Sequence, residues 1–225
     1  MTELFEVSDR YDRRLALGAS GVLHDFNEAG VLTAADVHVA RRLGELTGER
    51  DERALLAAAL ATRAVRHGSV CLDLATVADV APELPWPAYD AWVGAVAESP
   101  LVGQGVLRWE FDLLYLDRYR HQEQEVCTDL RRRLAQPPPA VDLAVLDTGL
   151  QRVFGEPTFA EQRAASRRAA TQWTTVLTGG PGTGKTTTVR AIVQAHEAID
   201  HRVVLCAPTG RAAKRMSEAA GREAR

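Results

Sequence analysis

The sequence predicts a two-part chain: a mainly helical first part with a small β element, followed by the beginning of an α/β domain that binds phosphate. Helix-forming segments rich in Ala and Leu occupy most of residues 1–136, and the β-rich stretch Val106–Leu116 interrupts them. Pro137-Pro138-Pro139 cannot continue a helix, so a linker is expected at 137–139 and a second domain at 140–225. That second part contains Thr174–Val189, TTVLTGGPGTGKTTTV, which fits the pattern G-x-x-x-x-G-K-[ST].

In the first part, local signals define the predicted elements. Thr33 followed by Asp36 gives a capping-box-like helix start, and Arg50–His67 predicts a helix closed by Gly68. Val106–Leu116 predicts a strand or hairpin. The remaining predicted elements are helices at Gly21–Ala29, Asp73–Val80, Ala88–Ala97 and Asp117–Gln136 and a strand at Ser69–Leu72.

The glycine-rich stretch has the strand–loop–helix context that a phosphate-binding loop requires. An apolar run at Thr175–Leu177 precedes it, and a helix-forming segment from Thr186 to His196 follows. Glycines let the backbone turn tightly and present N–H groups to an anion at the positive end of that helix. Lys185 would reach the β- and γ-phosphates and the Thr186 hydroxyl would hold Mg²⁺, so these two are the candidate catalytic residues. The residues of the loop predicted to bind a nucleoside triphosphate are Gly179, Gly180, Pro181, Gly182, Thr183, Gly184, Lys185, Thr186 and Thr187.

A second stretch, Val203–Met216 (VVLCAPTGRAAKRM), reads as a strand at Arg202–Cys206, a turn and a helix to about Ala220. The Thr209 hydroxyl, the N–H groups of the helix start and the cations of the helix suit a phosphodiester backbone. The alternative is an ordinary turn followed by a helix with solvated arginines. Considered without other information, the two readings are about equally supported.

Together, LTGGPGTGKTTTV and APTGRAAKRM resemble superfamily 1 helicases, and within them the RecD family, the alpha subunits of exodeoxyribonuclease V. The resemblance implies that the second part is an incomplete RecA-like P-loop α/β helicase domain. It also implies an adenine-reading role for Gln162, for which a surface glutamine at a helix start is the alternative. The residues implied to contact single-stranded DNA are Pro208, Thr209, Gly210 and Arg211.

Two short stretches extend the resemblance into the first part, HGSVCL at 67–72 and LYLDRY at 114–119. In the RecD family the N-terminal region packs against RecC. The resemblance therefore implies a subunit that works with RecB and RecC at double-strand ends, using ATP and Mg²⁺ to move 5′→3′ along single-stranded DNA. Two alternatives stay open: a RecD-like helicase that acts without RecB and RecC, and a non-catalytic module that docks on RecC.

A complete motor also needs an acidic pair at a strand end and an arginine finger. The only Asp-Glu pair, Asp51-Glu52, is far from the loop and follows no strand, so we expect an incomplete, inactive motor that binds nucleotide weakly. In the RecA-like fold the loop strand and the Arg202–Cys206 strand are not neighbours. Both strands are therefore expected to have bare edges.

Composition limits the remaining possibilities. A net charge of −3 gives no overall nucleic-acid signal, so any DNA contact must be local. The three cysteines are far apart and lack metal-ligand spacing, which favours a reducing compartment. No apolar run approaches the length of a membrane span, and no secretory signal is apparent. These observations favour a cytoplasmic protein without a membrane partner.

Overall fold

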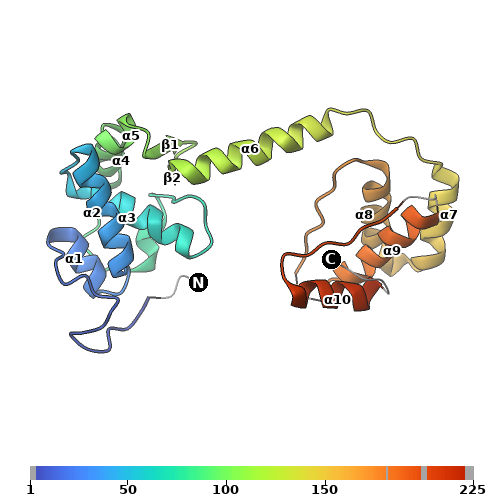
Figure 1. Cartoon of the computed structure of the whole chain (residues 1–225), viewed down its shortest axis with the longest axis horizontal. Helices are drawn as coiled ribbons and strands as arrows, with labels where there is room; N and C mark the ends of the chain where they lie inside the picture. The colour runs from blue at the N-terminus through green and yellow to red at the C-terminus, as the bar shows by residue number, and fades with distance from the viewer. Residues whose placement is uncertain (1–3, 181, 199–201, 221–225) are drawn as a thin grey trace. The chain divides into compact units, whose positions relative to one another are not determined.

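The computed structural model describes residues 4–180, 182–198 and 202–220. Two compact units share the chain, Met1–Val126 and Cys127–Arg225 (Figure 1). Helix α6, Asp117–Leu134, spans the division along the sequence, and the prolines at 137–139 follow it in irregular chain. None of the described helices is both long and apolar enough to cross a membrane.

The first unit is mainly helical with one hairpin, as predicted. The central helix is α3, Glu52–Arg66. It packs against helices α1 (Gly21–Glu28), α2 (Ala34–Thr47) and α4 (Tyr89–Ala97) and against strand β2 (Leu113–Leu116). Its Ala- and Leu-rich sequence lets neighbours approach closely on several sides, so most of its residues are buried. The other helical elements are α1 (Gly21–Glu28), α2 (Ala34–Thr47), the 3₁₀ turn η1 (Val77–Val80), α4 (Tyr89–Ala97) and α5 (Pro100–Gly103).

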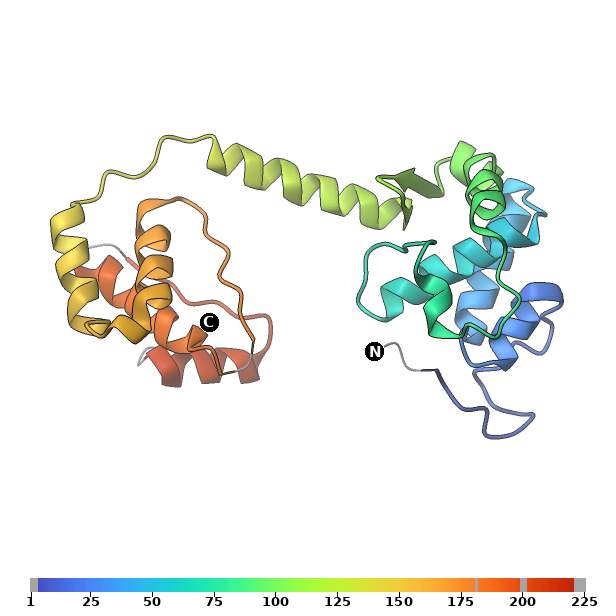
Figure 2. The same ribbon diagram turned by 180° about the vertical axis from the view of Figure 1, so that it is seen from behind.

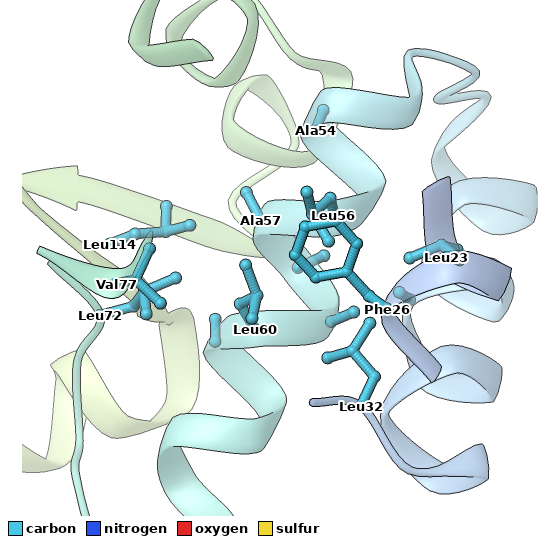
Figure 3. Packing of buried hydrophobic residues seen from close by; sticks show 14 of the residues in the cluster. Leu23, Phe26, Leu32, Ala54, Leu56, Ala57, Leu60, Leu72, Val77 and Leu114 are labelled. Atoms are coloured by element: carbon cyan, nitrogen blue, oxygen red, sulfur yellow. The ribbon is translucent and has the colours of Figure 1, made fainter. Parts of the chain in front are cut away.

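Apolar side chains from several elements meet on α3. Figure 3 shows Phe26 pointing from α1 toward Leu56 of α3, while Leu72 and Leu114 lie on another side of the same helix. Phe26 and Leu56 have no exposed surface. This core is contained within the first unit, and it requires no contribution from the second.

The β element is the antiparallel hairpin of β1, Leu107–Glu110, and β2, Leu113–Leu116. Of the two alternatives predicted for Val106–Leu116, a strand or a hairpin, the structure shows the hairpin. Leu107 pairs with Leu116 in its register. The strand predicted at Ser69–Leu72 is reduced to a single bridge between Leu72 and Leu114. The helix predicted at Asp73–Val80 is a 3₁₀ turn only.

The second unit is a cluster of helices around a small apolar core. Its elements are α7 (Leu143–Val153), the 3₁₀ turn η2 (Pro157–Phe159), α8 (Ala160–Thr171), α9 (Lys185–Ala198) and α10 (Gly210–Ala220). Leu146, Leu150 and Phe154 from α7 and its end pack against Ala170 of α8 and Ala191 of α9. Figure 2 shows α8 and α9 with irregular chain between them.

The prediction of two strands in this unit, at Thr175–Leu177 and Arg202–Cys206, was wrong for the described residues. The described residues of both segments are irregular. Among the described residues, the sheet consists of the β1–β2 hairpin of the first unit. A strand needs a partner for its N–H and C=O groups, and neither segment pairs with another described segment. Val176 and Val204 are 74% and 59% exposed, so their apolar side chains do not pack as sheet residues would.

Candidate nucleotide site

The glycine-rich loop adopts a conformation that larger residues would disrupt. Gly182 and Gly184 both have φ of +78°, in the left-handed region that favours glycine. A Cβ atom at Gly179 would lie 2.6 Å from Oγ1 of Thr183, too close for any real contact. The Thr183 hydroxyl donates a 2.9 Å hydrogen bond to the carbonyl oxygen of Gly180, which closes the loop on itself.

Lys185 is the first residue of α9, and its side chain turns back over the loop. Its ammonium group donates to the carbonyl oxygens of Gly179 and Gly180. One turn further on, the buried Thr188 contributes its N–H and its hydroxyl to the carbonyl oxygen of Gly184, at 2.9 and 3.1 Å. Hydrogen bonds thus join the loop to the start of α9, and the ammonium group of Lys185 contacts the glycine backbone.

Gln162 comes to the same place from a different element. It lies in the first turn of α8, and its Nε2 is 3.4 Å from the carbonyl oxygen of Thr183, 21 residues later. Its Oε1 is buried and has no hydrogen-bond partner among the described residues. A buried acceptor without a partner is costly, and a ligand donor would remove that cost.

Packing of α8 fixes the position of Gln162. Ala170 of α8 is 1% exposed in the core of the unit. Nε of Arg167 donates to Oδ1 of Asp147 on α7 over 2.9 Å, which aligns α8 with α7. These contacts join the C-terminal half of α8 to α7 and α9, and the first turn of α8 contacts the loop through Gln162.

The first turns of α8, the glycine-rich loop and the start of α9 line a pocket of about 210 Å³. Glu161, Gln162 and Ala165 of α8 line one wall, and Gly179, Thr183 and Lys185 contribute from the loop and α9. The pocket therefore offers a carboxamide with a free acceptor at one wall and a cation with a glycine loop at another. These are the groups that a base edge and a phosphate chain require.

Other predicted nucleotide residues do not line the pocket. Thr186 and Thr187 are exposed in the first turn of α9. The carbonyl oxygen of Gly180 accepts a hydrogen bond from Lys185. A Cβ atom placed at Gly184 would lie 3.6 Å from Nε2 of Gln162. Pro181 lies outside the described residues.

The residues predicted to contact DNA lie at the start of α10. Thr209 precedes this helix, and its Oγ1 accepts a 3.3 Å hydrogen bond from the N–H of Ala212. Pro208, Thr209, Gly210 and Arg211 are all exposed, and α10 packs against α9. They form a separate surface, because none of them lines the pocket.

Sequence reasoning missed five residues that line the pocket: Glu161, Ala165, Leu177, Thr178 and Thr188. Thr188 could have been found from helical spacing, since it lies one turn after Lys185 on α9. Glu161 had no signal beyond its position next to Gln162. A larger hollow of about 520 Å³ lies in the first unit, but its cations Arg14 and Arg66 already pair with carboxylates.

Comparison with known families gives one match within each unit of the chain. Residues 162–225 match the family described as an AAA domain, so Gln162, the loop and the Thr209 segment all fall within one match. Residues 28–115 match the family described as RecBCD enzyme subunit RecD, N-terminal domain. The chain is thus similar to the RecD N-terminal domain within its first unit and to an AAA domain within its second.

Individual relatives confirm the resemblance to the RecD family. The chain is 50% identical over 224 residues to RecBCD enzyme subunit RecD of Mycobacterium tuberculosis, a match that covers 94% of the chain and 38% of that protein. It is 51% identical over 201 residues to the same subunit of Mycolicibacterium smegmatis, covering 85% of the chain and 35% of the relative. It is also 35% identical over 128 residues to the ATP-dependent RecD2 DNA helicase of Deinococcus radiodurans, covering 57% of the chain and 17% of that protein.

Each of these matches covers less than half of the relative's own length. The chain resembles the N-terminal portion of RecD, and it spans about 38% of the length of the Mycobacterium tuberculosis relative.

Proposed function

We propose that the chain forms the nucleotide-binding part of a RecD-type DNA helicase subunit, in which ATP with Mg²⁺ drives 5′→3′ movement along single-stranded DNA. The observation that carries the proposal is the position of Gln162 beside the glycine-rich loop. Distant sequence signals for a base reader and a phosphate loop meet at one pocket. An ordinary glycine turn would not require that coincidence.

Each residue of the pocket has a role in this proposal. The carboxamide of Gln162 offers both an acceptor and a donor, which matches the adenine amino group and a ring nitrogen. Lys185 would exchange its contacts with the carbonyl oxygens of Gly179 and Gly180 for phosphate oxygens. Thr186, at the start of α9, would place its hydroxyl on Mg²⁺. Hydrolysis of bound ATP would supply the energy for movement.

The DNA contact is proposed at the start of α10. The exposed Thr209 and Arg211 present a hydroxyl and a guanidinium at the N-terminus of a helix, where the helix dipole favours an anion. Such groups bind the phosphate backbone without reading sequence. RecB and RecC are the proposed partner subunits, because relatives that match 94% and 85% of the chain are named as RecBCD enzyme subunits.

A second candidate function is a RecD2-type helicase that acts without those subunits. The 35% identity to the Deinococcus radiodurans helicase supports it, over 57% of the chain. Stable co-purification of this chain with RecB and RecC would favour the first candidate. Failure to associate, combined with nucleotide binding, would favour the second.

The base-reading role is tested by measuring the affinities of ATP and GTP for the wild-type chain and for Gln162→Ala. We expect the variant to lose about tenfold in preference for ATP over GTP, the equivalent of roughly 1.4 kcal/mol. Gln194→Ala is the matched control, since Gln194 is an exposed glutamine on α9 outside this pocket. An unchanged preference in Gln162→Ala would contradict the proposed role.

A further inference from the structure

The turn of the β1–β2 hairpin has an unfavourable residue for its backbone conformation. Phe111 and Asp112 connect the strands, with φ of 57° and 58°. A two-residue turn with both φ positive normally contains Asn-Gly or Asp-Gly, since these residues tolerate the left-handed region. A bulky residue such as phenylalanine is a conformational outlier there.

The side chain of Phe111 gains little from packing in return. It is 78% exposed, the second most exposed of the large hydrophobic residues described. Its described ring contact is with the guanidinium of Arg120, whose central carbon lies 5.4 Å from the ring centroid. An outlier that burial does not explain points to a role in binding.

The hairpin presents this ring on a rigid support. Leu114, in β2, has no exposed surface and bridges to Leu72 on the neighbouring segment. Arg120 is held in turn by Glu110, through its Nε at 2.9 Å and its Nη2 at 2.6 Å. A hairpin whose backbone is fixed before binding loses less conformational entropy when a partner covers its tip.

The charges near the tip indicate the chemistry of that partner. Glu110 and Glu123 both pair with the single guanidinium of Arg120, and the exposed Asp112 adds a third carboxylate. This excess of negative charge repels the phosphates of a nucleic acid, so a base-stacking role is disfavoured. It suits an apolar pocket with a cationic rim on another protein.

We propose that Phe111 is the anchor of a protein–protein interface, inserting into an apolar, basic-rimmed pocket on the RecB–RecC pair. Naming that partner rests on the proposed function. Aromatic residues that fill a partner's pocket commonly dominate the binding energy of an interface. The acidic flank of the hairpin would then pair with the rim of the pocket and set the orientation.

The test measures binding of the full chain to purified RecB–RecC pair from the same source, using Phe111→Asn. Asparagine tolerates the left-handed conformation, so the thermal midpoint of the variant should be unchanged or higher. Affinity should fall at least about tenfold. The matched control is Tyr11→Asn, because Tyr11 is another aromatic residue of the same unit and is 71% exposed. Its affinity should stay within about twofold of wild type.

The outcomes separate the inference from the proposed function. If the wild-type chain binds the RecB–RecC pair and Phe111→Asn binds it with the same affinity, the role of Phe111 as anchor is overturned and the proposed partner is not. Absence of wild-type binding would overturn both the partner assignment and the anchor. Loss of single-stranded DNA binding, or of self-association in sedimentation, with RecB–RecC binding intact would show that Phe111 serves a different contact and would also overturn the inference.

Discussion

At the scale of single residues, the loop glycines explain why the candidate site has its shape. Gly184 has φ of +78° and connects the loop to α9, close to Nε2 of Gln162. A methyl group there would both strain the backbone and approach the carboxamide. The loop therefore depends on a residue without a side chain at this position.

Replacement of Gly184 by alanine should weaken binding of Mg²⁺–ATP by about tenfold or more, given the cost of roughly 1–2 kcal/mol for a left-handed residue with a Cβ. Isothermal titration calorimetry measures this affinity directly. Gly149→Ala is the control, because Gly149 lies on α7, where a Cβ would meet no atom within 4 Å. Equal affinities for the two variants would contradict the role of the loop conformation.

We expect Asp12 to make the stability of the first unit sensitive to acid. Its carboxylate accepts hydrogen bonds from Nε of Arg14 at 2.9 Å and from Nη2 at 2.6 Å, and these hold the pKa of Asp12 far below its usual range. A carboxyl group with a lowered pKa in the folded state stabilises that state above its unfolded pKa. This contribution is lost as the pH falls.

The free energy of unfolding of wild type should therefore exceed that of Asp12→Asn at neutral pH. The difference should shrink as the pH falls below about 4, the pKa of an unfolded aspartate. Urea denaturation at a series of pH values measures it. A difference that stays constant from neutral pH into strong acid would show that the carboxylate contributes nothing through its charge.

At the scale of elements, local signals predicted the helices well, because a helix forms its hydrogen bonds within one segment. The start of α2 is an example: the N–H and the hydroxyl of Thr33 both donate to Oδ2 of Asp36 over 2.8 Å, which confirms the capping box. Local sequence signals could not show whether the segments at 175–177 and 202–206 form strands. Their formation depends on partner strands, and apolar sequence alone does not supply these.

The same carboxylate of Asp36 also accepts from Nη2 of Arg66 on α3 at 2.8 Å, and Asp36 itself is 1% exposed. Asp36→Ala should lower the free energy of unfolding by about 2 kcal/mol, through the lost cap and the unpaired groups left behind. Chemical denaturation measures the change. The control is Glu45→Ala, which removes the exposed pair with Arg42 and should cost less than about 1 kcal/mol. A similar decrease in the free energy of unfolding of both variants would contradict the proposed contribution of the buried Asp36 carboxylate.

Prediction of the candidate site was limited for a related reason. The loop motif and the candidate glutamine were visible in the sequence, since each has a recognisable local context. Their meeting in one pocket depends on how α8 packs against α7 and α9, through contacts such as Arg167 with Asp147. The strained Phe111 gave no sequence signal, because a Phe-Asp pair does not predict a positive φ.

At the scale of the whole molecule, each unit has an apolar core of its own. The first unit resembles the RecD N-terminal domain over residues 28–115, and the second contains the candidate nucleotide pocket. We propose the domain boundary at residues 137–139, between these two cores. Nucleotide chemistry should then depend on the second unit alone.

The most direct test of the nucleotide site uses the two lysines of the chain, Lys185 and Lys214. Calorimetry should detect binding of one Mg²⁺–ATP per wild-type chain, and Lys185→Met should weaken it by at least about tenfold, the loss of one charge-assisted phosphate contact. Lys214→Met removes the same charge from the exposed face of α10 and, without DNA, should bind as wild type does. Equal binding by wild type and both variants, or no binding by wild type, would contradict the assignment of this pocket to a nucleotide.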